Sequence, residues 1–308
     1  MCGIGAFQIV GGECDPTTVA RVLLRLLEVR GRDASGVAWH DKGETYILKA
    51  AVAGSVLARQ IGNDVGTTGI VHTRWATQGS PKREVNNHPI DATGVVGVHN
   101  GHCSNDDQLL RMCEGYKRKG EVDSEAIFAL IAHGPKGTKL RERLSKVQGG
   151  AALFWLRTND KHERLHVARL QSSPLVLGMT KGGSIIGAST ESIVREAAKR
   201  CDLTLDLVHV LPEGTYMRCE GGNISETQTI EMPRKWSFSL PDYSKRSTYS
   251  APTRQQLPAP QSKADELTLE MLLEAEIEQE IADRLETDTL RDAMDRQFGM
   301  GRYSDRRR

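Results

Sequence analysis

Short strand-like segments recur through the first 230 residues, separated by turns or by helical patterns. The first, Ile4–Val10, is followed by Asp15-Pro16, which supplies a helix N-cap and a proline at the first helical position. A helix is expected from there to Gly31, and others from Asp123 or Ser124 and over Thr190–Arg200. Further strands are expected at Gly36–His40, Thr45–Lys49, Gly69–His72, Val95–His99, Ala151–Arg157, Leu165–Arg169, Leu175–Gly178, Ser184–Gly187, Leu203–Val210 and Gly214–Arg218. Mixed strands and helices at this spacing predict an α+β layered domain over residues 1–230.

The composition changes after residue 230. Residues 231–264 are rich in Pro, Ser, Arg and Gln, which predicts a linker or an extended arm. Residues 265–308 are predicted to form an amphipathic helix, up to Arg296, and a basic tail. The apolar residues of this helix fall four apart at Leu269, Leu273, Ile277, Ile281 and Leu285. We expect the helix to dock on its own domain or on a sister subunit, with a different protein as the alternative. The tail is interpreted as a solvated terminus rather than a nucleic-acid patch.

Overall composition excludes several classes of function. The net charge of +1 gives the whole chain no electrostatic reason to bind nucleic acid or a membrane surface. The six cysteines are scattered without a C-x-x-C pair, so neither a metal site nor a disulfide framework is predicted. No apolar run is long enough for a membrane span or a signal peptide. We therefore expect a cytoplasmic protein with reduced thiols and without a cofactor.

Cys2 follows only Met1 in the sequence. Loss of Met1 would place a thiol and a free α-amine on the same residue. An unperturbed thiol has a pKa of about 8.5 and an α-amine one of about 7.7–8.0, so the amine can take the proton of the thiol near neutral pH. This combination is typical of an N-terminal nucleophile that carries its own base. The alternative is that a cysteine stands early in the chain by chance.

A polar loop follows the expected strand at Gly69–His72. Arg74 offers a fork of two N–H donors that suits a small carboxylate, and Trp75 supplies a flat apolar wall. Gly79 and Pro81 would let the loop move as a lid. The alternative is a surface loop whose arginine makes a peripheral salt bridge.

Two further clusters contain groups that suit acyl transfer. The side-chain amide of Asn100 and the backbone N–H of Gly101 could stabilise an oxyanion, although Asn-Gly is also the commonest hairpin dipeptide. Asp123 stands at the start of an expected helix, where its carboxylate could receive a substrate ammonium. Asp123 or Ser124 could equally act as the helix N-cap, and the two roles can coexist.

Together these motifs resemble the class II glutamine amidotransferases, and in particular the glutaminase half of glucosamine-6-phosphate synthase. The resemblance covers about the first two-thirds to three-quarters of the chain. It rests on the order of Cys2-Gly3-Ile4, Arg30–Gly36, His72–Pro81, Asn87-His88-Pro89, Val98–Gly101, Asp123-Ser124-Glu125, Ser173-Pro174-Leu175 and Leu211–Gly214. It implies a four-layer αββα sandwich of the N-terminal-nucleophile hydrolase fold, here with a C-terminal helical extension.

The resemblance also implies a mechanism. Cys2 would attack the side-chain amide of L-glutamine with its α-amine as general base, while Asn100 and the Gly101 N–H hold the oxyanion. Ammonia would leave, and water would hydrolyse the γ-glutamyl thioester. Arg74 would bind the substrate α-carboxylate and Asp123 its α-ammonium. The loop that closes over glutamine would include Trp75, Thr77 and Gly79.

Arg30, His88 and His99 are given supporting roles within these motifs. Arg30 is expected either to frame Cys2 or to order its own turn. His88 and His99 are interpreted as structural hydrogen-bonding residues, because this mechanism does not need them as bases. The chain departs from the synthase-like pattern at Gln78, where histidine is usual, and at Arg32, where an aromatic residue is usual. These departures predict altered loop closure and an altered wall near the nucleophile.

The expected fate of the ammonia rests on residues 231–308. This stretch is too short for the sugar-isomerase, phosphoribosyltransferase or ATP-pyrophosphatase domains of related enzymes, because typical domains have about 100–150 residues. We therefore expect a stand-alone glutaminase subunit with a separate ammonia-accepting synthetase or transferase, and a possible homo-oligomer through residues 265–296. Two alternatives are an N-terminal-nucleophile amidase for another small amide and a catalytically silent assembly protein.

Overall fold

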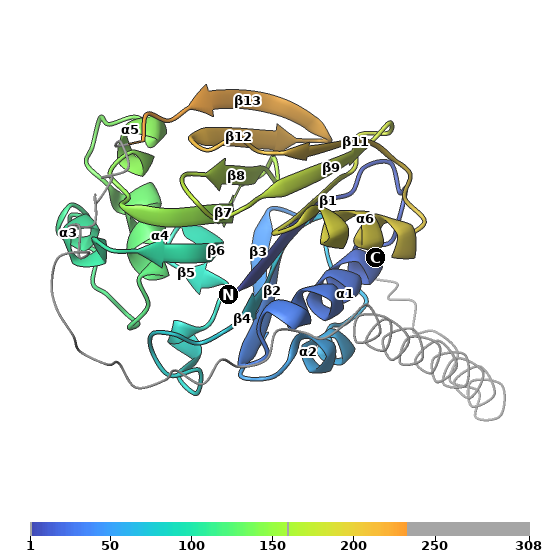
Figure 1. The fold of residues 1–308 in the computed structure, drawn as a ribbon, viewed down its shortest axis with the longest axis horizontal. Coiled ribbons are helices and arrows are strands. Elements are labelled where there is room, and N and C mark those ends of the chain that lie inside the picture. The colour runs from blue at the N-terminus through green and yellow to red at the C-terminus, as the bar shows by residue number, and fades with distance from the viewer. Residues whose placement is uncertain (1, 159, 233–308) are drawn as a thin grey trace, which may run out of the picture. The chain divides into compact units, whose positions relative to one another are not determined.

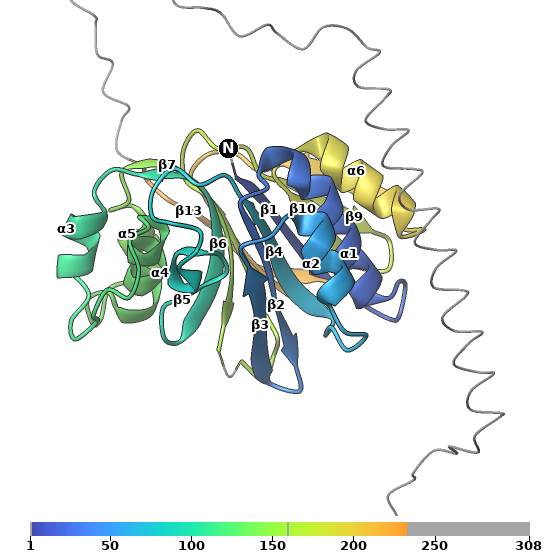
Figure 2. The same cartoon turned by 90° about the horizontal axis from the view of Figure 1, so that it is seen from below.

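The computed structural model describes residues 2–158 and 160–232, and two antiparallel sheets form the centre of this part of the chain. Helices cover the outer face of each sheet (Figures 1 and 2). The layers therefore follow the order helices, sheet, sheet, helices. The predicted four-layer α+β sandwich is confirmed. Its predicted C-terminal extension (residues 265–308) lies outside the described residues.

The first sheet has seven strands and contains the start of the chain near its middle. Its order is β11 (Leu205–Val210), β9 (Val176–Thr180), β10 (Ile185–Ala188), β1 (Gly3–Gln8), β4 (Thr68–Arg74), β2 (Ala34–Asp41) and β3 (Glu44–Ala50). The second sheet has six strands. Its order is β13 (Asn223–Thr229), β12 (Thr215–Glu220), β8 (Leu165–Arg169), β7 (Gly149–Arg157), β6 (Val95–Cys103) and β5 (Ile90–Asp91).

The helices divide between the two outer layers. Those on the first sheet are α1 (Pro16–Leu27), α2 (Gly54–Gln60) and α6 (Glu191–Arg200). Those on the side of the second sheet are α3 (Asp106–Arg111), α4 (Ser124–His133) and α5 (Leu140–Leu144), and short 3₁₀ turns lie at η1 (Glu28–Arg30) and η2 (Glu84–Asn86). Asp15 caps α1 as predicted, because its carboxylate accepts from the backbone N–H of Thr17 at 3.2 Å and of Thr18 at 3.0 Å. No helix among the described residues is long and apolar enough to cross a membrane.

Strand periodicity explains how the layers pack. Ile4 of β1 faces the space between the sheets, whereas Phe7 faces α1. In β7, Phe154 faces the space between the sheets and Trp155 faces α4. All four side chains are fully buried. Burial of each large apolar side chain favours folding by about 1.5–3 kcal/mol, so this alternation holds both sheets to their neighbours.

The sequence missed several short or polar elements. β13 was not predicted, because its sequence is mostly polar and none of its residues is fully buried. The seven-residue α2 begins with a glycine, and α3 and α5 are shorter still, so none has a clear helical period. The predicted strands match observed ones with ends shifted by a few residues. The predicted linker (231–264) beyond residue 232 and the predicted helix (265–296) lie outside the described residues.

Candidate active site around Cys2

Cys2 directly precedes β1 in the middle of the first sheet. The side chain of Cys2 is partly exposed. The next residue, Gly3, pairs with Thr73 of β4. A Cβ atom at Gly3 would lie 2.6 Å from Thr73 Oγ1 and 3.0 Å from the carbonyl oxygen of Leu27. Only glycine therefore allows β1 to lie this close to α1 and β4. The Cys-Gly pair is explained by this close approach.

A turn after α1 packs against the backbone of Cys2 and of the predicted loop. The Nε atom of Arg30 donates to the carbonyl oxygen of Cys2 at 3.0 Å, which is a direct framing contact. A Cβ atom at Gly31 would lie 2.3 Å from the carbonyl carbon of Arg74, so glycine is needed there as well. Arg32 points away, since its side chain is 74% exposed and pairs with Glu28 at 2.7 Å.

Asp33 fastens the same turn to the start of the loop. Its backbone N–H donates to the carbonyl oxygen of Arg74 at 3.0 Å. Its carboxylate accepts from the backbone N–H of Ala76 at 2.7 Å. The turn thereby holds the peptide groups around Trp75, whose carbonyl oxygen lies 3.6 Å from the Sγ atom of Cys2 and accepts its hydrogen bond.

Arg74 is buried beneath the loop that it precedes. Its guanidinium donates to the carbonyl oxygen of Gly79 and to the side-chain oxygen of Asn87, both at 2.7 Å, and to the carbonyl oxygen of Gln78. The guanidinium therefore orders the loop as well as lying near Cys2. Gln78, in turn, donates from Nε2 to the carbonyl oxygen of Glu121 at 2.7 Å.

The residues predicted to close over a substrate lie on the exposed side of this loop. Trp75 is 57% exposed, and Thr77 is also exposed. Gly79 has a φ of +73°, and a Cβ atom there would contact Asn86 Nδ2 at 2.8 Å. The backbone therefore turns at Gly79, which is one of the residues predicted to let the loop move as a lid.

Asn100 and Gly101 lie in the last part of β6, and they extend the strand rather than form the tip of a hairpin. They pair with Ala152 and Ala151 of β7. The other neighbour of β6 is β5, which pairs only as far as Gly97. Beyond that point the second edge of β6 has no partner strand in the described part of the chain. The hairpin interpretation of Asn-Gly is therefore wrong.

Strand geometry defines the direction of the Gly101 N–H. Backbone groups of alternate residues point to opposite sides of an antiparallel strand. The Ser104 N–H donates toward β7, to Gln148, whereas the Cys103 N–H donates away from β7, to Asp123. Gly101 has the parity of Cys103, so its N–H points away from β7. A Cβ atom at Gly101, where φ is +150°, would lie 1.9 Å from the carbonyl oxygen of Gly150.

Asp123 lies on this same side of β6. Its Oδ2 atom accepts from the backbone N–H of Cys103 at 2.6 Å and lies 3.5 Å from Nδ1 of His102. Its Oδ1 atom accepts from the hydroxyl of Ser124 at 3.3 Å. The side chain makes no capping hydrogen bond to α4. Asp123 therefore occupies the N-cap position of α4 without capping the helix through its side chain, and its carboxylate faces the end of β6.

A hydrogen bond between the two sheets places Cys2 and the end of β6 at the same end of the sandwich. His72 of β4 pairs with Ile4, and its Nε2 atom lies 3.3 Å from the carbonyl oxygen of His99. Since His99 directly precedes Asn100, the end of β6 lies beside the start of β1. The charges of Arg74 and Asp123 both act on the thiol of Cys2.

The protonation state of Cys2 follows from its position. Burial raises the pKa of the Cys2 thiol, and the nearby carboxylate of Asp123 acts in the same direction, while the positive charge of Arg74 opposes the shift. The thiol is therefore protonated at neutral pH. An attack by sulfur from this position requires a base.

The neighbouring histidines are neutral and occupied in packing. His72 and His88 stack with their ring centres 4.0 Å apart, and burial lowers the pKa of His72 to about 3 and that of His88 well below its usual range. Burial also lowers the pKa of His99, whose Nδ1 atom lies 2.8 Å from the hydroxyl of Ser124. His99 therefore forms hydrogen bonds as predicted. Both ring nitrogens of His88 are buried without a hydrogen-bond partner among the described residues, so the hydrogen-bonding role predicted for His88 is wrong.

Three residues that organise the site were not singled out from the sequence. Asn87 holds Arg74 and donates to the carbonyl oxygen of Pro81 at 2.7 Å. Glu121 accepts from Asn86 Nδ2 at 2.8 Å and pairs with Arg83, so it joins the loop to the segment before Asp123. Asp33 is the third. Asn87 and Asp33 stand inside the motifs quoted above, and that was the available signal.

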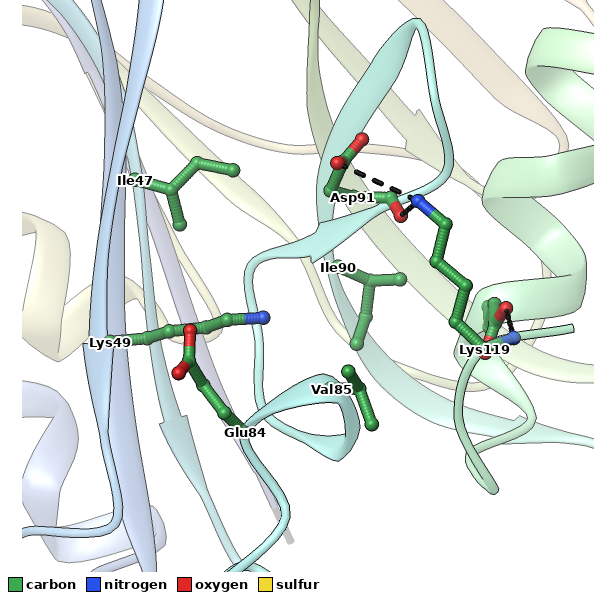
Figure 3. A pocket seen from close by; sticks show the side chains of 8 residues that line it. Ile47, Lys49, Glu84, Val85, Ile90, Asp91 and Lys119 are labelled. Carbon is green, nitrogen blue, oxygen red and sulfur yellow. Dashed lines mark hydrogen bonds and ion pairs between the residues drawn. The ribbon is translucent and has the colours of Figure 1, made fainter.

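A pocket of about 240 Å³ lies elsewhere, between β3 and the segment that contains η2 and β5 (Figure 3). Its two lysines are already engaged. Lys49 donates to the carbonyl oxygens of Asn87 and Pro89, and Lys119 contacts Asp91. None of the predicted site residues lines this pocket. No cluster of metal-ligating side chains occurs among residues 2–158 and 160–232.

Solved structures with this architecture define the class of fold. A glutamine phosphoribosylpyrophosphate amidotransferase from B. subtilis superposes with a TM-score of 0.61 at 19% identity, over 75% of this chain and 50% of that chain. A structure described as the allosteric regulatory enzyme of purine biosynthesis gives a TM-score of 0.60 at 20% identity, again over 75% of this chain and 50% of that one. The fold is that of the N-terminal-nucleophile hydrolases, with a cysteine at the start of a central strand.

Similarity to curated relatives identifies the family within this fold. Proteins named glutamine–fructose-6-phosphate aminotransferase [isomerizing] match at 33% identity in Caldanaerobacter subterraneus, over 63% of this chain and 33% of that protein. The corresponding match in Thermococcus kodakarensis has 31% identity over 82% of this chain and 44% of that protein. No protein-family model matches. The described part of the chain is a class II glutamine amidotransferase domain, as its motifs predicted. The chain spans 33% and 44% of the length of these two relatives.

Proposed function

We propose that the chain hydrolyses L-glutamine to glutamate and ammonia, with Cys2 as the nucleophile. The observation that carries this proposal is the convergence of four groups at one end of the sandwich. They are the thiol of Cys2, the free edge of β6 at Asn100-Gly101, the guanidinium of Arg74 and the carboxylate of Asp123. A cation and an anion near one nucleophile suit the two charged ends of a free amino acid.

The proposed reaction begins after Met1 has been removed. The α-amine of Cys2 takes the proton of the thiol, whose pKa is raised by burial, and sulfur attacks the amide carbon of glutamine. The Asn100 amide and the Gly101 N–H stabilise the oxyanion of the tetrahedral intermediate. The amine returns the proton to the departing ammonia. Water then hydrolyses the γ-glutamyl thioester to glutamate and restores the thiol.

Asn100→Ala tests the oxyanion assignment. We expect kcat for glutamine hydrolysis to fall by about 10²–10³-fold with KM little changed, because one transition-state donor is lost. Asn100→Asp keeps the size of the side chain and should be at least as slow, since its negative charge opposes the oxyanion. Release of glutamate and ammonia is the measurement, and Asn223→Ala, an exposed substitution in β13, is the matched control. A folded Asn100→Ala protein with normal kcat would contradict the assignment.

We further propose that the ammonia is passed to an acceptor enzyme outside residues 1–308. We propose that this acceptor is a separate protein in the cytoplasm. Residues 231–308 are interpreted from their sequence as a linker and a docking helix, which supports a role in recruiting that partner or in forming a homo-oligomer. The names of the curated relatives suggest a sugar phosphate as one candidate acceptor substrate.

Affinity purification of the tagged chain tests whether the acceptor is a separate protein. We expect a synthetase or transferase to be recovered, and the recovered complex to form an aminated product from glutamine. The same experiment with residues 265–308 deleted should lose the partner if that segment is the docking element. Recovery of the partner by the shortened chain would assign this segment to self-association instead. Absence of any aminated product would contradict ammonia transfer.

A further inference from the structure

Cys14 and Cys201 lie close together, although they are far apart in the sequence. Cys14 directly precedes Asp15, the N-cap of α1, and Cys201 is the C-cap residue of α6. These two helices lie side by side on the outer face of the first sheet (Figures 1 and 2). Both cysteine side chains pack in the same apolar cluster, and both are free thiols. The start of one helix is thus placed against the end of the other.

The two thiols are close enough for a hydrogen bond between their side chains. The Sγ atom of Cys14 donates to the carbonyl oxygen of Asp15 at 3.6 Å, which leaves Cys201 as the donor between the two sulfurs. Accepting this hydrogen bond lowers the pKa of Cys14, and donating it raises the pKa of Cys201. The N-terminal end of α1 also favours a thiolate. Cys14 is therefore the more nucleophilic thiol of the pair.

A cavity of about 490 Å³ lies next to this pair. It is lined by Glu13 and Asp202, which are the chain neighbours of the two cysteines, and by Leu203. Cys14 is partly exposed, whereas Cys201 is buried. A small reagent therefore reaches Cys14 first, and Cys201 is positioned behind it.

We propose that Cys14 and Cys201 form a reversible disulfide site, which a small-molecule disulfide closes and a thiol reductant opens. The Cys14 thiolate attacks one sulfur of the reagent, which forms a mixed disulfide and releases one thiolate. Cys201 then attacks Sγ of Cys14, releases the second thiolate and forms the internal S–S bond. Two protein thiols and one reagent disulfide give one protein disulfide and two reagent thiols.

The remaining cysteines do not share these features. Burial raises the pKa of both Cys103 and Cys113 to about 11 and that of Cys219 to about 12, so these thiols stay protonated at neutral pH. Cys2 lies before β1, whereas Cys14 follows its opposite end. Closure of the bond therefore fastens α1 to α6 without involving Cys2. This inference does not depend on the proposed glutaminase activity.

Incubation of the reduced full chain with oxidised glutathione tests the proposal. Peptide mapping without reduction should recover the peptides of Cys14 and Cys201 joined to each other, and dithiothreitol should separate them. We expect the oxidised protein to melt roughly 5 °C or more above the reduced protein, because the cross-link restricts the unfolded chain. Cys14→Ser and Cys201→Ser should each lose both the linkage and the shift in melting temperature.

Cys113→Ser is the matched control, since it removes a buried thiol elsewhere and should keep both effects. The Cys201→Ser protein has a second, positive readout, because glutathione should then remain attached to Cys14. Two results would overturn the proposal. One is glutathione retained on Cys14 in the wild-type protein, and the other is the absence of a linkage between Cys14 and Cys201.

Discussion

Replacement of Cys2 by alanine is expected to abolish glutamine hydrolysis, with a loss in kcat of about 10⁴-fold or more. The reason is that the sulfur forms the thioester, and the thiol of Cys103 at the nearby end of β6 is buried, with its pKa raised to about 11. The Cys2 side chain is small and partly exposed, so alanine leaves the strand intact. Glutamate release by the purified wild-type and variant proteins is the measurement. Equal rates in the two proteins would refute the proposed function.

A chain that keeps an extra residue before Cys2 separates the thiol from the α-amine. The sulfur is unchanged in that protein, but the amine is consumed in a peptide bond, so we expect it to be as inactive as Cys2→Ala. Mass spectrometry of the intact protein establishes which N-terminus is present. Full activity with a blocked amine would show that another group is the base, and the proposed thioester chemistry would survive that result.

Acid is expected to destabilise the fold steeply, because several buried histidines are neutral. Burial holds the pKa of His72 and of His166 at about 3, and that of His88 is also well below its usual range. In the unfolded chain each imidazole has a pKa of about 6.5, so protons bind the unfolded state first as the pH falls. The stabilisation that comes from keeping these imidazoles neutral is therefore fully present above a pH of about 6.5 and is lost as the pH falls toward about 3.

The size of this effect is large relative to the stability of a domain. Each of the three histidines contributes a slope of up to about 1.4 kcal/mol per pH unit, so the free energy of unfolding should be about 6 kcal/mol lower at a pH of about 5 than at about 8. Typical domains have about 5–15 kcal/mol in all. Urea unfolding at several pH values measures the slope.

His166→Phe provides the variant for this measurement. Phenylalanine keeps an aromatic ring beside Trp155, which stacks on His166 with ring centres 5.1 Å apart, but it cannot take up a proton. The slope should fall by about one third of the part due to the three histidines. Asn223→Ala is the control, because it changes an exposed side chain in β13 that does not titrate and should leave the slope unchanged. A stability that does not change between neutral and acid pH would contradict the assignment of buried neutral imidazoles.

Most of the architecture could be predicted from local sequence patterns. The strand at Ile4–Val10 and the helix after Asp15-Pro16 have strong periodicity and clear boundary residues, and both are observed with small shifts. β13 and α2 could not be predicted, since β13 is an edge strand with little apolar surface and α2 is stabilised by packing against α1. Hydrophobic periodicity reflects which side chains are buried. Elements with few buried side chains therefore have no clear periodicity and cannot be predicted from it.

The residues of the candidate site could also be predicted from the sequence, but their arrangement could not. Cys2, Arg74, Asn100 and Asp123 could be named because each belongs to a short motif whose residue types suit one reaction. Their arrangement could not be derived in this way. The Asn-Gly pair was equally compatible with a hairpin, and only the pairing with β7 beyond the end of β5 excludes that alternative.

Local motifs are therefore enough to predict the proposed class of chemistry, because a nucleophile, its base and oxyanion donors are properties of particular residue types. Which residues position these groups follows from the packing of the fold. Asn87 holds Arg74, and Glu121 joins the loop to the segment before Asp123. These hydrogen bonds connect segments that are distant in the chain. Such partners are chosen by how two sheets and their loops pack, and no local pattern of residues contains that information.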